Sequence, residues 1–190
     1  MKRQLENFIK TKVKNPKEIE VKAILDIFEE RTYGKGELFK EANTISKELG
    51  FLTRGSTRLF MIKENGDDVT GQIVQQDCFL GDMISIRTQE STPIVIEFLE
   101  NSSMLVASVS KVGQLLETNL AFNILLREHI SDQTVAMGKQ YITFITGTAK
   151  ERYQFIMDNN PDLLKKFPLR FIASMIGVTP TQLSRVRNKK

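Results

Sequence analysis

The hydrophobic pattern changes its period twice along the chain, and this change restricts the possible fold more than any other feature. Residues 1 to about 29 carry apolar side chains at three- and four-residue spacing, which indicates helix. From 30 to about 109 the period is two, as in strands, and from 110 to 145 the helical period returns. The apolar positions of the first segment are Val21, Ile24, Leu25 and Phe28. The sequence therefore predicts an α+β fold with a β-domain between helical segments.

Short strands separated by turn residues are predicted for the middle segment. Asn65-Gly66 lies between two of them and predicts a hairpin, because a type I′ turn needs positive φ at both central positions. Many short strands with regular turns favour a barrel or a sandwich. The predicted strands are Glu48–Thr53, Thr57–Lys63, Val69–Val74, Ile94–Leu99 and Met104–Ser108.

The segment 110–145 has a seam whose positions repeat as in a coiled coil, with two glutamines among them. A long helix between two domains predicts a dimer stalk, and the alternative is a helix that packs on its own β-domain. Thr146-Gly147-Thr148 ends this helix, and Glu151 allows a capping box with Thr148 that begins the next one. The seam positions are Leu126, Ile130, Gln133, Met137, Gln140 and Phe144.

Cys78 is the only cysteine and His129 the only histidine of the chain. One cysteine cannot form an internal disulfide, and it cannot hold a zinc ion or an iron–sulfur cluster alone. We favour a polar residue on a helix flank for His129 over a metal ligand or the base of a hydrolase. No nucleophile–base pair, metal-ligand spacing or Walker-type loop is present. The sequence therefore predicts a protein that is not an enzyme and has no cofactor and no metal.

No apolar run approaches the roughly 20 residues that a membrane-spanning helix needs. The basic N-terminus, MKRQLENFIKTKVK, has no apolar core of the kind found in secretory signals. We therefore expect a cytoplasmic protein with no membrane partner.

Positive charge is concentrated in the last 26 residues. Residues 165–190 hold seven basic and no acidic residues, whereas the other 164 hold 20 basic and 23 acidic residues. A basic segment on an otherwise mildly acidic chain suggests a polyanionic partner, and a solvated basic tail is the alternative.

The same C-terminal segment, PLRFIASMIGVTPTQLSRVRNKK, has the pattern of a helix-turn-helix. Ala173 provides the small residue that two closely crossing helices need, and Gly177, four positions later, tolerates positive φ in the turn. Thr179, Pro180 and Gln182 together predict a capped helix start. The apolar positions expected to hold the two helices together are Ile172, Val178, Leu183 and Val186. The alternative is a helical hairpin without a DNA-binding role.

The outward face of the second helix is predicted to contact double-stranded DNA. Gln and Arg side chains can make bidentate contacts to adenine and guanine edges, which suits Gln182 and Arg185. Phosphate contacts are expected from Thr179, Arg187 and the lysines. The complete predicted set is Thr179, Thr181, Gln182, Ser184, Arg185, Arg187, Lys189 and Arg170.

Four segments carry a resemblance to a known family: Tyr33-Gly34-Lys35-Gly36-Glu37, the run Phe51 to Arg58, Phe79-Leu80-Gly81-Asp82, and the C-terminal motif. Together they resemble the Crp/Fnr superfamily of bacterial transcription regulators, over nearly the whole chain. The resemblance implies a jelly-roll β-barrel sensor of the cyclic-nucleotide-binding type with N-terminal helices over 1–109. It further implies a dimerisation helix over 110–145 and a helix-turn-helix DNA-binding domain over 146–190, with Arg185 as the main base-reading residue.

Two features depart from the family pattern. Family members begin the phosphate-binding cassette with Gly-Glu and carry an arginine about ten residues later, whereas this chain has Gly81-Asp82 and then Gln89-Glu90-Ser91-Thr92-Pro93. Without that arginine a bound cyclic phosphate is unpaired, so we expect no cAMP binding of the usual kind. The candidate pocket residues are Gly81, Asp82, Met83, Arg87 and Thr92. The sequence also ends directly after the expected recognition helix, so wing contacts are expected to be absent or supplied elsewhere.

The sequence thus predicts a homodimeric, DNA-binding transcription regulator, with RNA polymerase as a further candidate partner and an undefined small-molecule effector. The alternative is a cyclic-nucleotide- or small-molecule-binding signalling module whose basic C-terminus binds a protein or a membrane.

Overall fold

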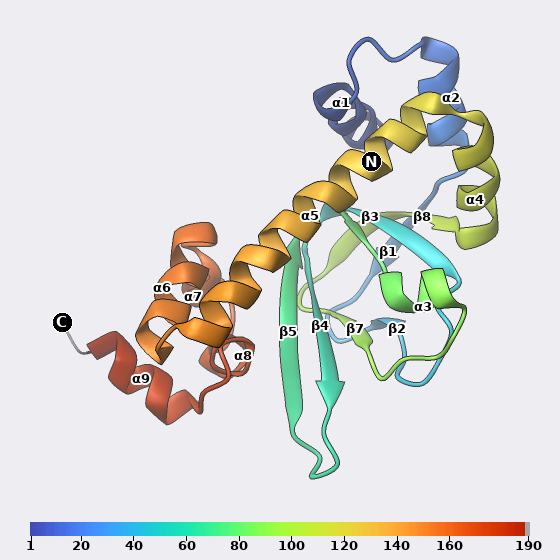
Figure 1. Cartoon of the computed structure of the whole chain (residues 1–190). Coiled ribbons are helices and arrows are strands. Elements are labelled where there is room, and N and C mark those ends of the chain that lie inside the picture. The colour runs from blue at the N-terminus through green and yellow to red at the C-terminus, as the bar shows by residue number, and fades with distance from the viewer. Residues whose placement is uncertain (189–190) are drawn as a thin grey trace. The chain divides into compact units, whose positions relative to one another are not determined.

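The computed structural model describes residues 1–188, which form nine helices and eight strands (Figure 1). By their internal contacts these residues divide into two units. The first contains residues 1–61 and 73–130, and the second contains 62–72 together with the chain from Ser131 onward. The predicted α+β class is therefore confirmed. In the described part of the chain, no helix is both long enough and apolar enough to cross a membrane.

The first unit begins with two helices, continues as strands with one short helix among them, and ends in the helical segment that leads to the second unit. Its helices are α1 (Lys2–Lys12), α2 (Glu18–Asp26), α3 (Met83–Thr88), α4 (Val109–Thr118) and the start of α5 (Leu120–Thr146). The strands are β1 (Glu29–Tyr33), β2 (Leu38–Lys40), β3 (Glu48–Arg54), β4 (Ser56–Ile62), β5 (Asp68–Gln75), β6 (Cys78–Leu80), β7 (Val95–Phe98) and β8 (Ser102–Ser108). The end of β4 and the start of β5, within residues 62–72, belong to the second unit.

The strands form two four-stranded antiparallel sheets, in the orders β1-β8-β3-β6 and β2-β7-β4-β5. In the first sheet Phe51 of β3 lies opposite Leu105 of β8 on one side and Phe79 of β6 on the other. The predicted β-domain therefore consists of two sheets and is not one closed barrel.

Strands β3 and β8 are buried on both faces. Because successive side chains of a strand point to opposite sides, neighbouring residues of these strands pack in two different apolar clusters. Phe51 and Leu105 pack in an apolar cluster with α1, α2, α4 and the start of α5. Their neighbours Leu52, Met104 and Val106 pack in a second cluster with residues of β5, β6 and β7. The middle of the first unit is thus a sheet with apolar side chains on each face.

Five of the eight strands lie within about two residues of their predicted bounds, whereas β1, β2 and β6 were not predicted. β1 reads Glu-Glu-Arg-Thr-Tyr, and β2 and β6 have three residues each, so none of them shows a clear two-residue apolar pattern. The hairpin between β4 and β5 is present, but its turn is not type I′. Gly66 has φ +86° whereas Asn65 is not among the positive-φ residues, and the Gly66 N–H donates to the Lys63 carbonyl.

The single helix predicted over 110–145 is two helices, α4 and α5, separated at Asn119. The Asn119 side-chain oxygen accepts a hydrogen bond from the Phe122 N–H at 2.9 Å, and its amide nitrogen donates to the Glu20 carbonyl at 2.9 Å. Asparagine at this position therefore caps α5, which is a role that competes with continuing a helix. The seam also changes, because Leu126 is buried in the core of the first unit.

The second unit contains the end of α5 and four further helices, together with the tip of the β4–β5 hairpin. Within this unit the Thr70 N–H donates to the Ser174 hydroxyl at 3.1 Å. The unit's buried apolar side chains come from each of the four helices and include Ile156, Leu163, Ile172 and Leu183. The four helices are α6 (Ala149–Asn159), α7 (Leu163–Lys166), α8 (Leu169–Met175) and α9 (Pro180–Asn188).

Candidate nucleic-acid interface

The turn between α8 and α9 is closed by backbone hydrogen bonds at the predicted glycine. Gly177 has φ +73°, in the left-handed region, and its N–H donates to the Ser174 carbonyl. The next N–H, of Val178, donates to the carbonyl of Ala173 at 3.0 Å. This pattern satisfies the last carbonyls of α8 and turns the chain sharply toward α9. The helix–turn–helix order that the sequence predicts for this segment is present.

Helix α9 starts with the predicted capping box. The Thr179 hydroxyl accepts from the Gln182 N–H at 3.2 Å, and the Gln182 side-chain oxygen accepts from the Thr179 N–H at 2.9 Å. Pro180 occupies the first helical position, where its missing N–H costs nothing. These three residues hold the start of α9 on the turn that follows α8.

Fully buried apolar side chains hold α8 against α9. Ile172, Ala173, Ile176 and Leu183 each have 0% of their surface exposed. Val178 and Val186, also predicted for this role, are partly buried. With a buried side chain at Leu183 and a partly buried one at Val186, α9 presents its opposite face to solvent.

The residues predicted to contact DNA lie mostly on that exposed face. Thr181, Gln182, Arg185 and Arg187 are exposed on α9, and Ser184 is partly buried. Thr179, before α9, and Arg170, on α8, are also exposed, and the Arg170 guanidinium lies 5.1 Å from the centre of the Phe171 ring. Lys189 lies outside the described residues.

The capping box limits what Gln182 can do. A bidentate contact to adenine uses both the oxygen and the nitrogen of the amide. The Gln182 oxygen already accepts the Thr179 N–H, so such a contact would require α9 to give up part of its cap. Thr181 and Arg185, four residues apart and both exposed on α9, make no such hydrogen bond among the contacts of residues 1–188 that are described here, and they would be freer to meet base edges if α9 bound DNA.

Arg152 of α6 has a positioning role that the sequence analysis did not find. Its Nε donates to the Gly147 carbonyl at 3.1 Å, and its Nη1 donates to the Ile176 carbonyl at 3.4 Å, directly before Gly177. The preceding Glu151 completes the predicted capping box with Thr148, and those hydrogen bonds hold the pKa of the Glu151 carboxyl below its ordinary value. Arg152 therefore joins the start of α6 to the end of α8, and no spacing in the sequence signals this long-range contact.

The predicted pocket residues separate into two groups. Asp82 and Thr92 are buried, and the Thr92 hydroxyl donates to the Asp82 carboxylate. Met83 and Arg87 are exposed on α3, and Gly81 lies partly buried before it. The structure brings together the acid and the residue ten positions later, but it does not place Arg87 beside them.

Within residues 1–188, no three His, Cys, Asp or Glu side chains come together as a metal site would require. His129 is buried on α5 with its ring 5.4 Å from the ring of Phe79 and 6.2 Å from that of Phe8. Cys78 Sγ lies 4.0 Å from His129 Nε2, and burial raises the pKa of this thiol to about 11. A thiol with so high a pKa is a poor nucleophile and a poor metal ligand at neutral pH.

Comparisons with solved structures identify this fold. No protein-family model and no curated protein sequence matches the chain. FixK2 from Bradyrhizobium japonicum superposes with a TM-score of 0.72 at 15% identity, over 86% of this chain and 84% of that one. A CooA mutant from Carboxydothermus hydrogenoformans gives a TM-score of 0.67 at 15% identity, covering 87% of this chain and 77% of that one. The c-di-GMP responsive global regulator CLP of Xanthomonas campestris gives 0.65 at 14% identity, over 91% of each chain. These are Crp/Fnr regulators, so the fold that the sequence resemblance implies is confirmed.

Proposed function

We propose that this protein is a homodimeric transcription regulator of the Crp/Fnr type, acting in the cytoplasm, which binds double-stranded DNA through α9. The observation that carries the proposal is the capped, anchored α9 with an exposed face of Thr181, Arg185 and Arg187. No acidic residue occurs from Lys165 onward, so the approach of a phosphate backbone is unopposed within this segment.

The exposed residues divide into two roles. Arg185, in the middle of α9, is the base-reading residue, because an arginine pairs two of its N–H groups with the O6 and N7 of guanine. Thr179 directly before α9, Arg187 near the end of α9 and Arg170 on α8 bind phosphates, which fixes the position of α9 without reading sequence. Thr181 adds a hydroxyl next to Arg185 that can donate to or accept from a base edge.

Dimerisation through α5 accounts for an exposed apolar stripe on this helix. Ile130, Met137, Tyr141 and Ile145 repeat at intervals of seven and four residues, so they share one side of α5. Met137, Tyr141 and Ile145 each expose more than 60% of their surface, which is costly for large apolar residues. A second copy of the helix would cover this stripe, which shares Ile130 and Met137 with the predicted seam and has Tyr141 and Ile145 in place of Gln140 and Phe144. The two α9 helices of a dimer would then enter successive major grooves about 34 Å apart.

The salt dependence of binding to one duplex tests the phosphate contacts. Each lost phosphate contact lowers the slope of log affinity against log salt by about 0.9. We expect Arg170→Ala and Arg187→Ala each to reduce the slope by about one unit per protomer and to weaken binding to all duplexes alike. Arg3→Ala, which removes an exposed arginine from α1, is the matched control and should leave the slope unchanged. Equal slopes for all four proteins would contradict the proposed interface.

A further inference from the structure

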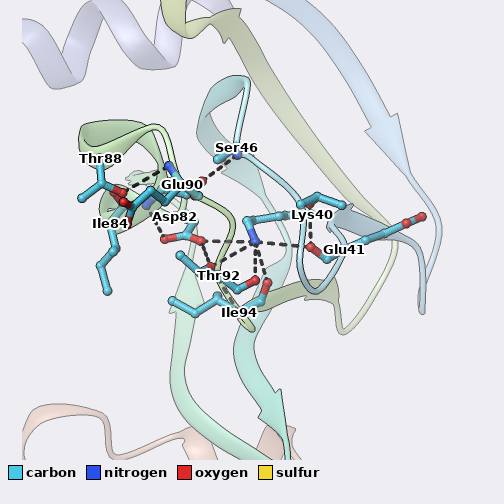
Figure 2. A network of polar contacts seen from close by, with 11 residues as sticks. Lys40, Glu41, Ser46, Asp82, Ile84, Thr88, Glu90, Thr92 and Ile94 are labelled. Carbon is cyan, nitrogen blue, oxygen red and sulfur yellow. Dashed lines mark hydrogen bonds and ion pairs between the residues drawn. The ribbon is translucent and has the colours of Figure 1, made fainter.

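A buried ion pair joins β2 to the start of α3 in the first unit (Figure 2). Lys40 Nζ lies 3.2 Å from Asp82 Oδ2, and the two side chains are 3% and 0% exposed. Taking two charges out of water costs several kcal/mol per ion, so such a pair persists only where further hydrogen bonds satisfy both groups.

The Lys40 ammonium is fully committed to the chain itself. Besides Asp82, its nitrogen lies 2.9 Å from the Ile94 carbonyl, 3.2 Å from the Thr92 hydroxyl and 3.2 Å from the Glu41 carbonyl. An ammonium has three N–H donors, and these four acceptors already exceed them. Lys40 therefore has no donor left for another molecule.

The Asp82 carboxylate is equally committed. Oδ1 accepts the Ser85 N–H at 3.1 Å, which caps α3, and Oδ2 accepts the Thr92 hydroxyl as well as facing Lys40. The Ser85 hydroxyl in turn donates to the Glu90 carbonyl at 2.6 Å and accepts the Ser46 N–H at 2.9 Å. Figure 2 shows these contacts drawing together the segment after β2, the start of α3 and the segment before β7.

We propose that Lys40 is an internal ligand of this site, whose ammonium fills the position between Asp82, Thr92 and the Ile94 carbonyl that a small external ammonium ion would otherwise take. The intact site accepts no phosphate or cyclic nucleotide, whereas removal of the Lys40 side chain opens a site for a small primary alkylammonium ion. The consequence for regulation is that no anionic effector controls DNA binding through this site, and this consequence alone rests on the proposed function.

Anion binding at Lys40 is the competing possibility, and the geometry disfavours it. A phosphate could pair with Lys40 only if the ammonium left Asp82, and the phosphate would then lie beside a buried carboxylate that had lost its cation. An uncompensated buried charge of this kind is strongly destabilising. The ligand class that fits the carboxylate, the Thr92 hydroxyl and the surrounding carbonyls is a cation with N–H donors.

Chemical rescue of the full-length Lys40→Ala variant tests the proposal. We expect Lys40→Ala to lower the Tm by roughly 10 °C, because it leaves the Asp82 charge buried and unpaired. Propylammonium chloride should restore much of this loss with a saturable dose dependence, while tetramethylammonium chloride and potassium chloride at equal ionic strength should not. Lys47→Ala is the matched control, since Lys47 is exposed between β2 and β3, and neither its Tm nor its response to propylammonium should differ from wild type.

A second pair of variants keeps the test decisive if Lys40→Ala does not fold. Lys40→Met keeps the apolar stem, and Lys40→Met with Asp82→Asn also removes the buried negative charge. The double variant should melt higher than Lys40→Met alone, because the remaining partner is then neutral. A double variant that melts no higher than Lys40→Met would overturn the assignment of Asp82 as the group that Lys40 neutralises.

Calorimetry with the wild-type protein tests whether the site around Lys40 and Asp82 excludes phosphate and cyclic nucleotides. Titration of inorganic phosphate, cAMP and cGMP should give no binding heat, and none of them should change the affinity for DNA. Micromolar binding of any of these probes, or an absence of rescue by propylammonium in folded Lys40→Ala, would overturn the proposal. The melting and calorimetric results do not involve DNA, so a protein that shows rescue but binds no duplex would refute only the proposed function.

Discussion

Thr179 and Gln182 exchange hydrogen bonds across the first turn of α9, with the Thr179 hydroxyl accepting at 3.2 Å and the Gln182 side-chain oxygen accepting at 2.9 Å. The first N–H groups of a helix have no partner within the helix, so these two contacts stabilise the end of α9 that is nearest the turn. They also fix the direction in which the exposed face points, because the cap and the buried Leu183 together set the orientation of the helix.

Loss of this cap should destabilise the protein and weaken DNA binding together. Thr179→Ala removes the hydroxyl acceptor and is expected to lower the free energy of unfolding by about 0.5–2 kcal/mol. Thr179→Ser keeps the acceptor and should remain close to wild type. Urea unfolding followed by circular dichroism measures both variants, and Thr181→Ala, which lacks a cap contact, should stay within about 0.5 kcal/mol. Equal destabilisation by the alanine and the serine variants would argue against the cap.

Gly177 is required for its backbone conformation rather than for space. An added Cβ would meet no atom closer than Arg152 Nη1 at 3.6 Å, but φ is +73°, where a side chain is strained. Gly177→Ala should therefore lower stability by roughly 1–2 kcal/mol. Gly113 lies exposed inside α4 with no atom within 4 Å of an added Cβ, so Gly113→Ala should raise stability by about 0.5–1 kcal/mol. Thermal melting distinguishes the two, and a shift of the same sign in both would contradict this account.

The apolar stripe of α5 predicts a dimer that one charge can dissociate. Met137→Glu places a carboxylate in the middle of the stripe, where burial against a second helix would leave it unpaired. Sedimentation equilibrium should show a dimer for wild type and a monomer for Met137→Glu at the same concentration. Ala136→Glu adds the same charge to another exposed side of α5 and should remain dimeric. A wild-type protein that is monomeric at micromolar concentration would contradict the predicted stalk.

Cys78 should react slowly with thiol reagents in the native protein. Burial raises its pKa to about 11 from an ordinary 9.0, and the thiolate is the reacting form. At pH 8 the thiolate fraction, and with it the rate with Ellman's reagent, should be about 100-fold lower than in the unfolded chain. The stability of the protein should also fall as the pH rises from about 9 to 11, because over this range only the unfolded state loses the thiol proton of Cys78. Equal native and unfolded rates would exclude a buried thiol.

Local sequence signals predicted the C-terminal helices well because each of those signals acts within a few residues. The Thr148–Glu151 and Thr179–Gln182 capping boxes and the positive φ of Gly177 are all decided by neighbouring residues, and all three are present. Strands β3 and β8 were also predicted, from the two-residue period and the recurring turn residues of the segment 30–109.

Contacts between distant residues were beyond the sequence analysis. Asn119 ends α4 partly through a hydrogen bond to the Glu20 carbonyl, and Arg152 binds the Ile176 carbonyl, 24 residues away. The pairing of Lys40 with Asp82 is of the same kind, since two side chains 42 positions apart carry no pattern that links them. The sequence showed that the arginine of the family pattern is absent, but it did not show that Lys40 neutralises Asp82.

The most direct test of the central claim is selection of duplexes from a random pool by the full-length protein, followed by binding of wild type and Arg185→Ala to the selected sequence. We predict enrichment of a two-fold symmetric site with half-sites about 10 base pairs apart. We also predict a loss of roughly 10- to 100-fold in affinity for Arg185→Ala, with relaxed preference at one position of each half-site. Recovery of no preferred sequence, or equal binding by Arg185→Ala and wild type, would contradict DNA recognition through α9.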